Sequence, residues 1–297
     1  MSNTKVLSWV ILVLLALMWG SSFILIKMGL EVYSAGEVGA LRIVAAAIFL
    51  TPVAISHLPK IDRKYIKLLF GIGLLGTFIP AFLFAIGQTR LDSGITGVLN
   101  GLVPIFVLIV GATFFHQKFE KAKYVGVVLA FIGTAILVTS GAGGIGSFNY
   151  YVIFIVIATA CYGTNLNLIK YYLADLSALV ITAISVALVG PIAGIYLFVG
   201  TPFVDTLSNE PGALAALGYI SLLGVMSTSI ALVLFNKLVQ ITTPIFSSMV
   251  TYLIPIVAIT WGLIDGEELR LGQILGIVAI LSGVLIANRK KKLKATS

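Results

Sequence analysis

Charged residues are scarce in this sequence. Of its 297 residues only 10% are charged and 59% are hydrophobic, whereas a soluble domain carries about 25% charged residues. A water-soluble fold could not cover so much apolar surface, so the composition excludes that class. Stretches of about 20 apolar residues, each long enough to cross a hydrocarbon core of roughly 30 Å as a helix, follow one another along the chain. The sequence therefore predicts an all-α polytopic membrane protein.

Residues for catalysis and metal binding are also few. The one cysteine, Cys161, lies in an apolar stretch, which excludes an intramolecular disulfide and is typical of a core residue. The two histidines lie in predicted connections, and the sequence has no HExxH, GxSxG or phosphate-binding loop and no closed-site metal spacing. We therefore expect no enzyme, no cofactor and no metal. The net charge of +8 does not indicate nucleic acid, because the basic residues lie in short connections and in the tail.

Ten membrane spans are predicted when the chain is divided at charges, glycine clusters and prolines. They are Leu7–Ile26, Glu37–Ile55, Tyr65–Gly87, Ile95–Phe115, Tyr124–Thr139, Tyr150–Ile169, Leu176–Val199, Ala213–Gln240, Ile245–Ile264 and Gln273–Ala287. The first is too long for a signal peptide and is interpreted as a retained helix. No acidic residue lies deep inside a span, so a proton relay through a buried carboxylate is not predicted.

The basic residues indicate the orientation. Ten spans place both termini on one side, and most lysines and arginines fall in connections on that side, whereas Lys27, Arg90 and Arg270 fall on the other. The positive-inside rule then predicts cytoplasmic N and C termini. The basic tail, residues 289–297, is interpreted either as a stop signal or as a site for anionic lipid.

The chain is built from two similar halves. The stretch Met18 to Lys27 recurs as Cys161 to Lys170, with an aromatic residue before glycine and two small polar residues in both copies. Five spans in each half is an odd number, so the halves cross the membrane in opposite senses as inverted-topology repeats, a plan that many transporters use. We expect repeats at residues 1–140 and 148–288, joined by a glycine-rich linker at 141–147.

Two residue pairs near the middle of the first and sixth spans are candidate solute contacts. Trp19 and Ser22 are three residues apart, as are Tyr162 and Asn165, so each pair shares one helix face. Trp and Tyr favour the membrane interfaces, and polar groups in hydrocarbon must face protein or a water-filled cavity. The pattern indicates a central cavity, although the glycines and small residues beside these pairs also suit close helix packing.

Further candidates are taken from the neighbouring spans. Phe78, Phe82, Asn100 and Tyr252 are predicted to contact the solute, with an interhelical hydrogen bond as the alternative for Asn100. The charged candidates for coupling or gating are Arg42, Glu37 and Glu267. Arg42 is either functional within the membrane or reaches the interface with its long side chain.

Several motifs together resemble the drug/metabolite transporter superfamily, in its ten-helix branch with two EamA-type repeats. The motifs are Trp19-Gly20-Ser21-Ser22-Phe23, Leu41-Arg42, Pro104 to Gly126 and Gly133, and Pro255 through Trp261 to Gly266-Glu267 followed by Gly276 and Gly283. One departure is that Gln117 stands in the first repeat where the second has Glu267.

The resemblance implies that helices one to four and six to nine surround a central cavity, with the fifth and tenth accessory. Members of the superfamily move amino acids, other metabolites, nucleobase-like compounds or quaternary amines, many as exporters. Carried over to this chain, the lining positions are Trp19, Ser22, Asn100, Tyr162, Asn165 and Tyr252.

These observations lead to one expected function and two alternatives. We expect a secondary-active or facilitative carrier in a bacterial inner membrane that exports a small amphipathic metabolite by alternating access. A quaternary-amine carrier is the alternative within transport, because aromatic faces attract cations. A non-transporting sensor or assembly factor on the same fold is the alternative outside it. The expected partners are a small solute and the lipid bilayer, with no nucleic acid, and a homodimer remains open.

Overall fold

Helices form all of the regular structure that can be described. The computed structural model describes residues 3–117, 121–140, 149–241 and 250–288, and every regular element in these ranges is helical. Seven helical stretches there are long and apolar enough to cross a membrane. They are Val6–Leu30, Ala35–Lys60, Arg63–Gln88, Ser93–Phe114, Val152–Tyr172, Ala178–Gly200 and Ala213–Phe235. The chain is therefore consistent with the predicted polytopic class.

Three shorter apolar helices correspond to the other predicted spans. They are α8 (Lys121–Val138), α15 (Val250–Ile264) and α16 (Leu271–Asn288). The first residues of the predicted ninth span fall in 242–249, outside the described ranges. The total of ten spans therefore remains a prediction.

Two of the long stretches are interrupted near their middle. The first consists of α1 (Asn3–Gly20) and α2 (Ser22–Leu30), which meet at Ser21. The fourth consists of α6 (Ser93–Asn100) and α7 (Val103–Phe114), and Pro104 lies in the first turn of α7. Proline has no N–H to donate and fits a first helical turn, so the helix restarts there.

The third and eighth spans each contain a π-helical segment. In the third span, η3 (Leu74–Phe78) separates α4 (Ile66–Gly73) from α5 (Ile79–Gln88). In the eighth, η4 (Gly224–Ile230) separates α12 (Ala213–Leu223) from α13 (Ala231–Ile241). Pro80 is the second residue after η3 and cannot donate to the preceding turn, whereas η4 contains no proline. Such widened turns are rare and often lie at functional sites.

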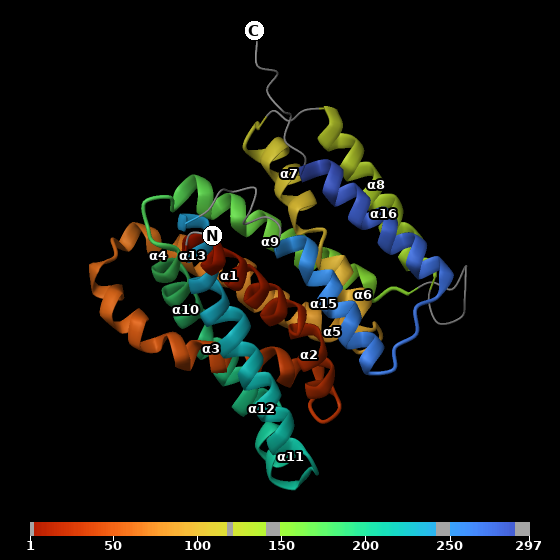
Figure 1. Cartoon of the computed structure of the whole chain (residues 1–297). Helices are drawn as coiled ribbons and strands as arrows, with labels where there is room; N and C mark the ends of the chain where they lie inside the picture. Colours follow the sequence, from red (N-terminus) through yellow and green to blue (C-terminus); the bar gives the residue numbers. More distant parts are fainter. Residues whose placement is uncertain (1–2, 118–120, 141–148, 242–249, 289–297) are drawn as a thin grey trace.

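Corresponding helices of the two halves pack against each other. The second span, α3 (Ala35–His57), lies along the seventh, α10 (Ala178–Gly200), and α8 lies along α16 (Figure 1). Glycine allows the second pair to approach closely, because a Cβ on Gly126 would lie 2.5 Å from the Gly283 carbonyl oxygen.

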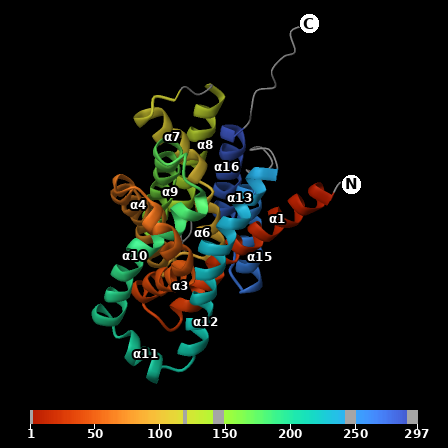
Figure 2. The same ribbon diagram turned by 90° about the vertical axis from the view of Figure 1, so that its left-hand side faces the viewer.

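The first span of each half contacts the third and fourth spans of the other half. The first span contacts α13 and α15, and the sixth, α9 (Val152–Tyr172), contacts α5 and α7. The short helices are η1 (Leu58–Lys60), η2 (Arg63–Tyr65) and α11 (Phe203–Asn209). Figures 1 and 2 show α11 at the opposite tip of the molecule from the start of α8. This reciprocal packing brings the interrupted and π-helical segments toward the middle of the bundle.

Candidate functional site

The backbone after α15 places Glu267 over the end of its own helix. Gly266 has a left-handed φ of 85°, and the Glu267 N–H donates to the Gly262 carbonyl at 2.8 Å. This is a Schellman end, in which glycine adopts the left-handed region at no steric cost. Gly262 also leaves space, because a Cβ there would collide with the Glu267 carboxylate. The carboxylate is thereby directed at α6 and α2.

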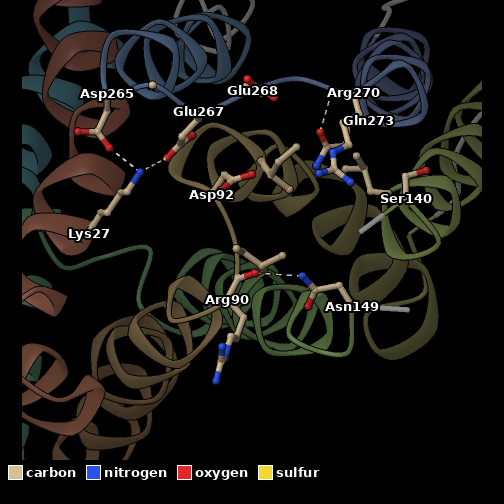
Figure 3. Close-up of a pocket in the computed structure, with 14 residues that line it drawn as sticks. Lys27, Arg90, Asp92, Ser140, Asn149, Asp265, Glu267, Glu268, Arg270 and Gln273 are labelled. Carbon is tan, nitrogen blue, oxygen red and sulfur yellow. Dashed lines mark hydrogen bonds and ion pairs between the residues drawn. The ribbon is translucent and has the colours of Figure 1, made fainter. Parts of the chain in front are cut away.

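Glu267 joins three spans at one end of the bundle. Its Oε1 accepts hydrogen bonds from the Lys27 Nζ at 3.0 Å and from the Ser93 N–H and hydroxyl, both at 2.8 Å. Its Oε2 accepts the Gly94 N–H at 3.0 Å, and Lys27 also pairs with Asp265 (Figure 3). A carboxylate at a helix N-terminus satisfies orphan N–H groups and is favoured by the helix dipole. We name Lys27, Ser93, Gly94, Asp265 and Glu267 the Lys27 clamp.

The pKa values of the two carboxyl groups beside α6, Glu267 and Asp92, are shifted in opposite directions. Burial works to raise the pKa of Glu267, but the Gly94 and Ser93 N–H groups, the Ser93 hydroxyl and Lys27 lower it below the ordinary 4.5. Burial, together with the negative charge of Glu267, raises the pKa of Asp92 above its ordinary 3.8. Glu267 therefore stays ionised in the clamp, and Asp92 is the carboxyl of the two that protonates first.

Two hollows open beside the clamp. One of about 340 Å³ lies between the starts of α6 and α16, and its lining includes Arg90, Asp92 and Arg270 (Figure 3). The second, of about 290 Å³, is lined by Ser34 and Gln88 among others, and Lys27 lines both. None of the predicted solute-contacting side chains that the structure describes lines either hollow. Both hollows are thus features of the clamp end rather than of the middle.

Gln117 occupies the corresponding place at the opposite end. It follows α7 as Glu267 follows α15, and its N–H donates to the Gly111 carbonyl at 2.9 Å. Its Nε2 donates to the Tyr171 hydroxyl at 2.5 Å and lies 3.5 Å from the Asn167 Oδ1. We name Gln117, Asn167 and Tyr171 the Gln117 contact, and it joins the fourth and sixth spans without an ion pair.

Trp19 and Ser22 both contact the π-helical segment of the eighth span. The Trp19 Nε1 donates to the Ser227 carbonyl at 2.9 Å, and the Ser22 and Ser227 hydroxyls are 2.7 Å apart. The Trp19 ring also lies 5.6 Å from the Phe235 ring. Ser22 is buried and hydrogen-bonded, so it joins two helices, whereas Trp19 is half-buried. Side-chain donors of this kind satisfy backbone groups in irregular membrane helices.

Tyr162 and Asn165 face the third span from α9. Tyr162 stacks on Phe84 with ring centroids 6.0 Å apart, and it interacts electrostatically with Arg42 of α3. The Asn165 amide lies directly over Gly76 in η3, and its Oδ1 is buried with no hydrogen-bond partner among the described residues. Each half therefore places at least one residue of this pair against the π-helical segment of the other half: Trp19 and Ser22 against η4, and Asn165 against η3.

The remaining predicted residues make other contacts. The ring centroids of Phe78 and Phe82 are 5.0 Å apart. The Phe82 ring also packs against Tyr196 of α10, with centroids 5.5 Å apart. Asn100 is half-buried at the break between α6 and α7. The Tyr252 side chain lies outside the described residues.

Glu37 has a local structural role. Its N–H donates to the Ser34 hydroxyl at 3.3 Å, and its Oε2 accepts the Ser34 N–H at 2.8 Å, which forms a capping box at the start of α3. The side chain is buried, and its Oε1 has no partner within the described ranges. Glu37 therefore caps α3, and its part in coupling or gating stays a prediction.

Several important contacts were absent from the sequence-based candidates. Lys27 was counted only as a charge in a connection, and Phe84 was not singled out. Lys27 is the last residue of the repeated motif, so the sequence did carry a signal for it. No three His, Cys, Asp or Glu side chains are grouped as a metal site in the part of the chain that the structure describes.

Comparison with known proteins gives a consistent result. An uncharacterized transporter of Archaeoglobus fulgidus is 26% identical over 285 residues, which cover 95% of this chain and 99% of the relative. The uncharacterized inner membrane transporter YedA of Escherichia coli is 25% identical and covers 94% and 90%. A probable terminal-alkyne amino-acid exporter of Streptantibioticus cattleyicolor is 25% identical and covers 94% and 92%.

A solved structure shares the fold. It matches 95% of this chain and 96% of its own with a TM-score of 0.58 at 14% identity. The model of the EamA-like transporter family matches twice, at residues 7–139 and 149–289. With its long apolar helices, this is a multi-pass protein of the plasma membrane and a transporter rather than an enzyme. The chain belongs to the EamA-like transporter family of the drug/metabolite transporter superfamily.

Proposed function

We propose that this protein is a secondary-active or facilitative carrier that exports a small amphipathic metabolite, an amino acid or a related compound, by alternating access. One observation carries the proposal: each half places its first span on the π-helical segment of the other half, through Trp19 and Ser22 on η4 and through Asn165 on η3. A site shared by two halves changes shape when the halves move against each other.

The proposed topology is two inverted five-helix repeats, at residues 1–140 and 148–288, with both termini in the cytoplasm. The two separate matches to the family model support the repeats. The surplus of lysine and arginine in the connections on the side of the termini supports the orientation. The Lys27 clamp would then face outward and the Gln117 contact would face the cytoplasm.

The proposed solute site lies between η3 and η4. Trp19, Tyr162, Phe78 and Phe82 would cover the apolar part of the solute, and Asn100, Asn165 and Tyr252 would orient its polar part. Ser22 would act mainly by holding η4, because both of its hydrogen bonds are made within the protein. The two halves contribute different residue pairs, Trp19 with Ser22 and Tyr162 with Asn165, which suits a solute whose two ends differ chemically.

The Lys27 clamp is the proposed outer gate. It closes the outer end by joining the first, fourth and ninth spans, so release of an exported solute requires Glu267 to leave Lys27 or α6. Arg42 and Glu37 were the other charged candidates. Arg42 interacts electrostatically with Tyr162, and Glu37 caps α3.

Flux into sealed proteoliposomes tests the carrier proposal. Purified protein should exchange radiolabelled amino acids, and Trp19→Ala and Asn165→Ala should change the order of preference differently because they contact different ends of the solute. Thr113→Ala, on the exposed face of α7, is the matched control. Identical profiles for the two variants would contradict the shared asymmetric site.

The amino-acid class is supported by the exporter relative and by charge. A quaternary amine about 8 Å from Arg42 would be repelled by about 2 kcal/mol at an effective dielectric constant of about 20. Choline therefore serves as the contrasting solute in the same vesicles. A protein that moves no solute but retains a stable protein partner would be a sensor or assembly factor, and the carrier proposal would be wrong.

A further inference from the structure

The partners of Lys27 in the Lys27 clamp both come from the second half of the chain. Its ammonium group pairs with Asp265 and with the Glu267 Oε1 at 3.0 Å, and both carboxylates follow α15 (Figure 3). Lys27 itself lies on α2, in the first half. When the two halves separate at this end, Lys27 loses both carboxylates at once. An ammonium group without a partner in a partly buried place is costly, so an open gate needs another acceptor for it.

The second hollow, of about 290 Å³, lies within the first half. Its lining residues come from the end of α2, from the turn into α3 and from the end of α5, and Lys27 is one of them. The hollow therefore stays beside Lys27 when the second half moves away.

Gln88 presents an unused acceptor to this hollow. Its Nε2 donates to the Phe23 carbonyl at 2.8 Å, which fixes the orientation of the amide, because the reverse orientation would place two oxygens against each other. Gln88 is only 6% exposed, and its Oε1 is buried with no hydrogen-bond partner among the described residues. A buried acceptor of this kind is stabilised by a donor that reaches it, and an ammonium group carries three.

Glu31 offers a carboxylate on the same side. It lies four residues after Lys27, and the backbone is still helical at Glu31, so the two side chains share one face of α2. Glu31 is exposed, lines the second hollow and takes part in no ion pair within the described ranges. Within its own half, Lys27 thus has one charged and one neutral acceptor that the closed clamp leaves unused.

We infer that Glu31 and Gln88 receive the Lys27 ammonium group when the outer gate opens, so that Lys27 exchanges its partners instead of losing them. The inference rests on the proposed carrier function and its outer gate. Rotation of the Lys27 side chain is enough for the exchange, because this side chain lines both hollows. Glu31 and Gln88 are positioning residues that act through Lys27 and lower the free energy of the open state.

Labelling of a buried cysteine reports how readily the gate opens. Val98 is buried in α6, one turn beyond Gly94 of the clamp. The full-length protein with Cys161→Ala and Val98→Cys is labelled with a maleimide in nanodiscs. Glu31→Gln should slow the labelling by about threefold to fivefold, the size expected for an ion pair open to water. Glu210→Gln removes another exposed carboxylate, which lines neither hollow, and should leave the rate unchanged.

Two substitutions of Gln88 isolate the contribution of its oxygen. Gln88→Leu and Gln88→Glu both remove the hydrogen bond to Phe23, but only Gln88→Glu keeps an acceptor in the hollow. Labelling should be about tenfold or more faster in Gln88→Glu than in Gln88→Leu, because hydrogen bonds between charged groups are strong. In a Lys27→Met background, this difference and the effect of Glu31→Gln should both disappear.

Three results would overturn the inference. They are equal rates in Gln88→Glu and Gln88→Leu, an unchanged rate in Glu31→Gln, and effects of the same size in the Lys27→Met background. Should the Gln88 variants fail to fold, Glu31→Gln with and without Lys27→Met still decides the question, because Glu31 is exposed and its substitution leaves the packing intact.

The failure of the inference differs from that of the carrier proposal. If sealed vesicles exchange solute but labelling does not depend on Glu31 or Gln88, the protein is a carrier and the exchange of partners is wrong. If labelling changes as expected but no solute crosses sealed vesicles, the exchange of partners holds and the carrier proposal is wrong.

Discussion

The loops that follow α7 and α15 have similar backbones but different side chains. In both, a residue with positive φ ends the turn, His116 at 51° and Gly266 at 85°. In both, the next N–H returns to a glycine carbonyl, at 2.9 Å from Gln117 and 2.8 Å from Glu267. The side chain that follows then lies over that glycine and reaches a neighbouring span.

The difference lies in charge. Glu267 accepts four hydrogen bonds, one from an ammonium group and two from N–H groups at a helix start, whereas Gln117 donates to a phenol and lies near an amide. Charge-assisted hydrogen bonds contribute about 1.5–3 kcal/mol each and neutral ones about 1. The same backbone thus supports a strong contact between spans at one end of the bundle and a weak one at the other.

Loss of Glu267 should have the largest effect on this difference. Glu267→Ala leaves Lys27 with Asp265 alone and leaves three donors of Ser93 and Gly94 without their acceptor, which should cost about 3 kcal/mol. Val98 is buried one turn further along α6. In a protein whose native cysteine is removed by Cys161→Ala, a cysteine in place of Val98 should be labelled about 100-fold faster when Glu267→Ala is added. Glu268→Ala, an exposed neighbour, is the control.

The same contribution should disappear in acid. Because its folded pKa is below the ordinary 4.5, Glu267 stabilises the clamp fully above that pH, and the contribution is lost as the pH falls through the folded pKa. In acid, a cysteine in place of Val98 should therefore be labelled at similar rates with and without the Glu267→Ala substitution. A rate difference that persists unchanged at pH 3 would show that the carboxylate charge does not hold the clamp.

At the other end, Gln117→Ala should have a smaller effect. It removes one neutral hydrogen bond to Tyr171 and a long contact to Asn167, so the expected loss is about 1 kcal/mol. Labelling of a cysteine in place of Val110, buried in α7 near this contact, should increase by less than tenfold. An effect as large as that of Glu267→Ala would remove the distinction between the two ends.

His116→Gly compares the two turns directly. A non-glycine residue in the left-handed region costs roughly 1–2 kcal/mol, of which the greater chain entropy of glycine offsets part, so the variant should be more stable by up to about 1 kcal/mol. Gly266→Ala should lower stability by a similar amount. Apparent melting temperatures of the two purified variants should therefore move in opposite directions.

The smallest expected effect is that of Asp92→Asn. A carboxyl with a raised pKa destabilises the fold where it is charged, so its contribution is favourable below its ordinary 3.8 and is lost as the pH rises through the folded pKa. The variant should melt slightly higher than wild type at neutral pH, and the two should converge in acid. Solvent reaches Asp92 and screens its charge, which keeps the shift small.

Much of the fold could be predicted from the sequence, because membrane helices are read from local composition. Long apolar stretches identify the spans, and the seven long helices lie where they were expected. The widened turns η3 and η4 were not predicted, since a π-turn depends on packing from neighbouring helices, although Pro80 marked one of the two places.

The repeated stretch around Trp19 and Tyr162 separates what could be predicted from the sequence from what depends on the fold. The family, the recurrence of this stretch and the helix face shared by each residue pair could be inferred from the sequence, because motifs and helical spacing are local properties. The contacts of Ser22 with Ser227, of Lys27 with Glu267 and of Arg42 with Tyr162 became visible only in the fold. These partners are more than a hundred residues apart, and no local pattern specifies which distant helix will cover a given face.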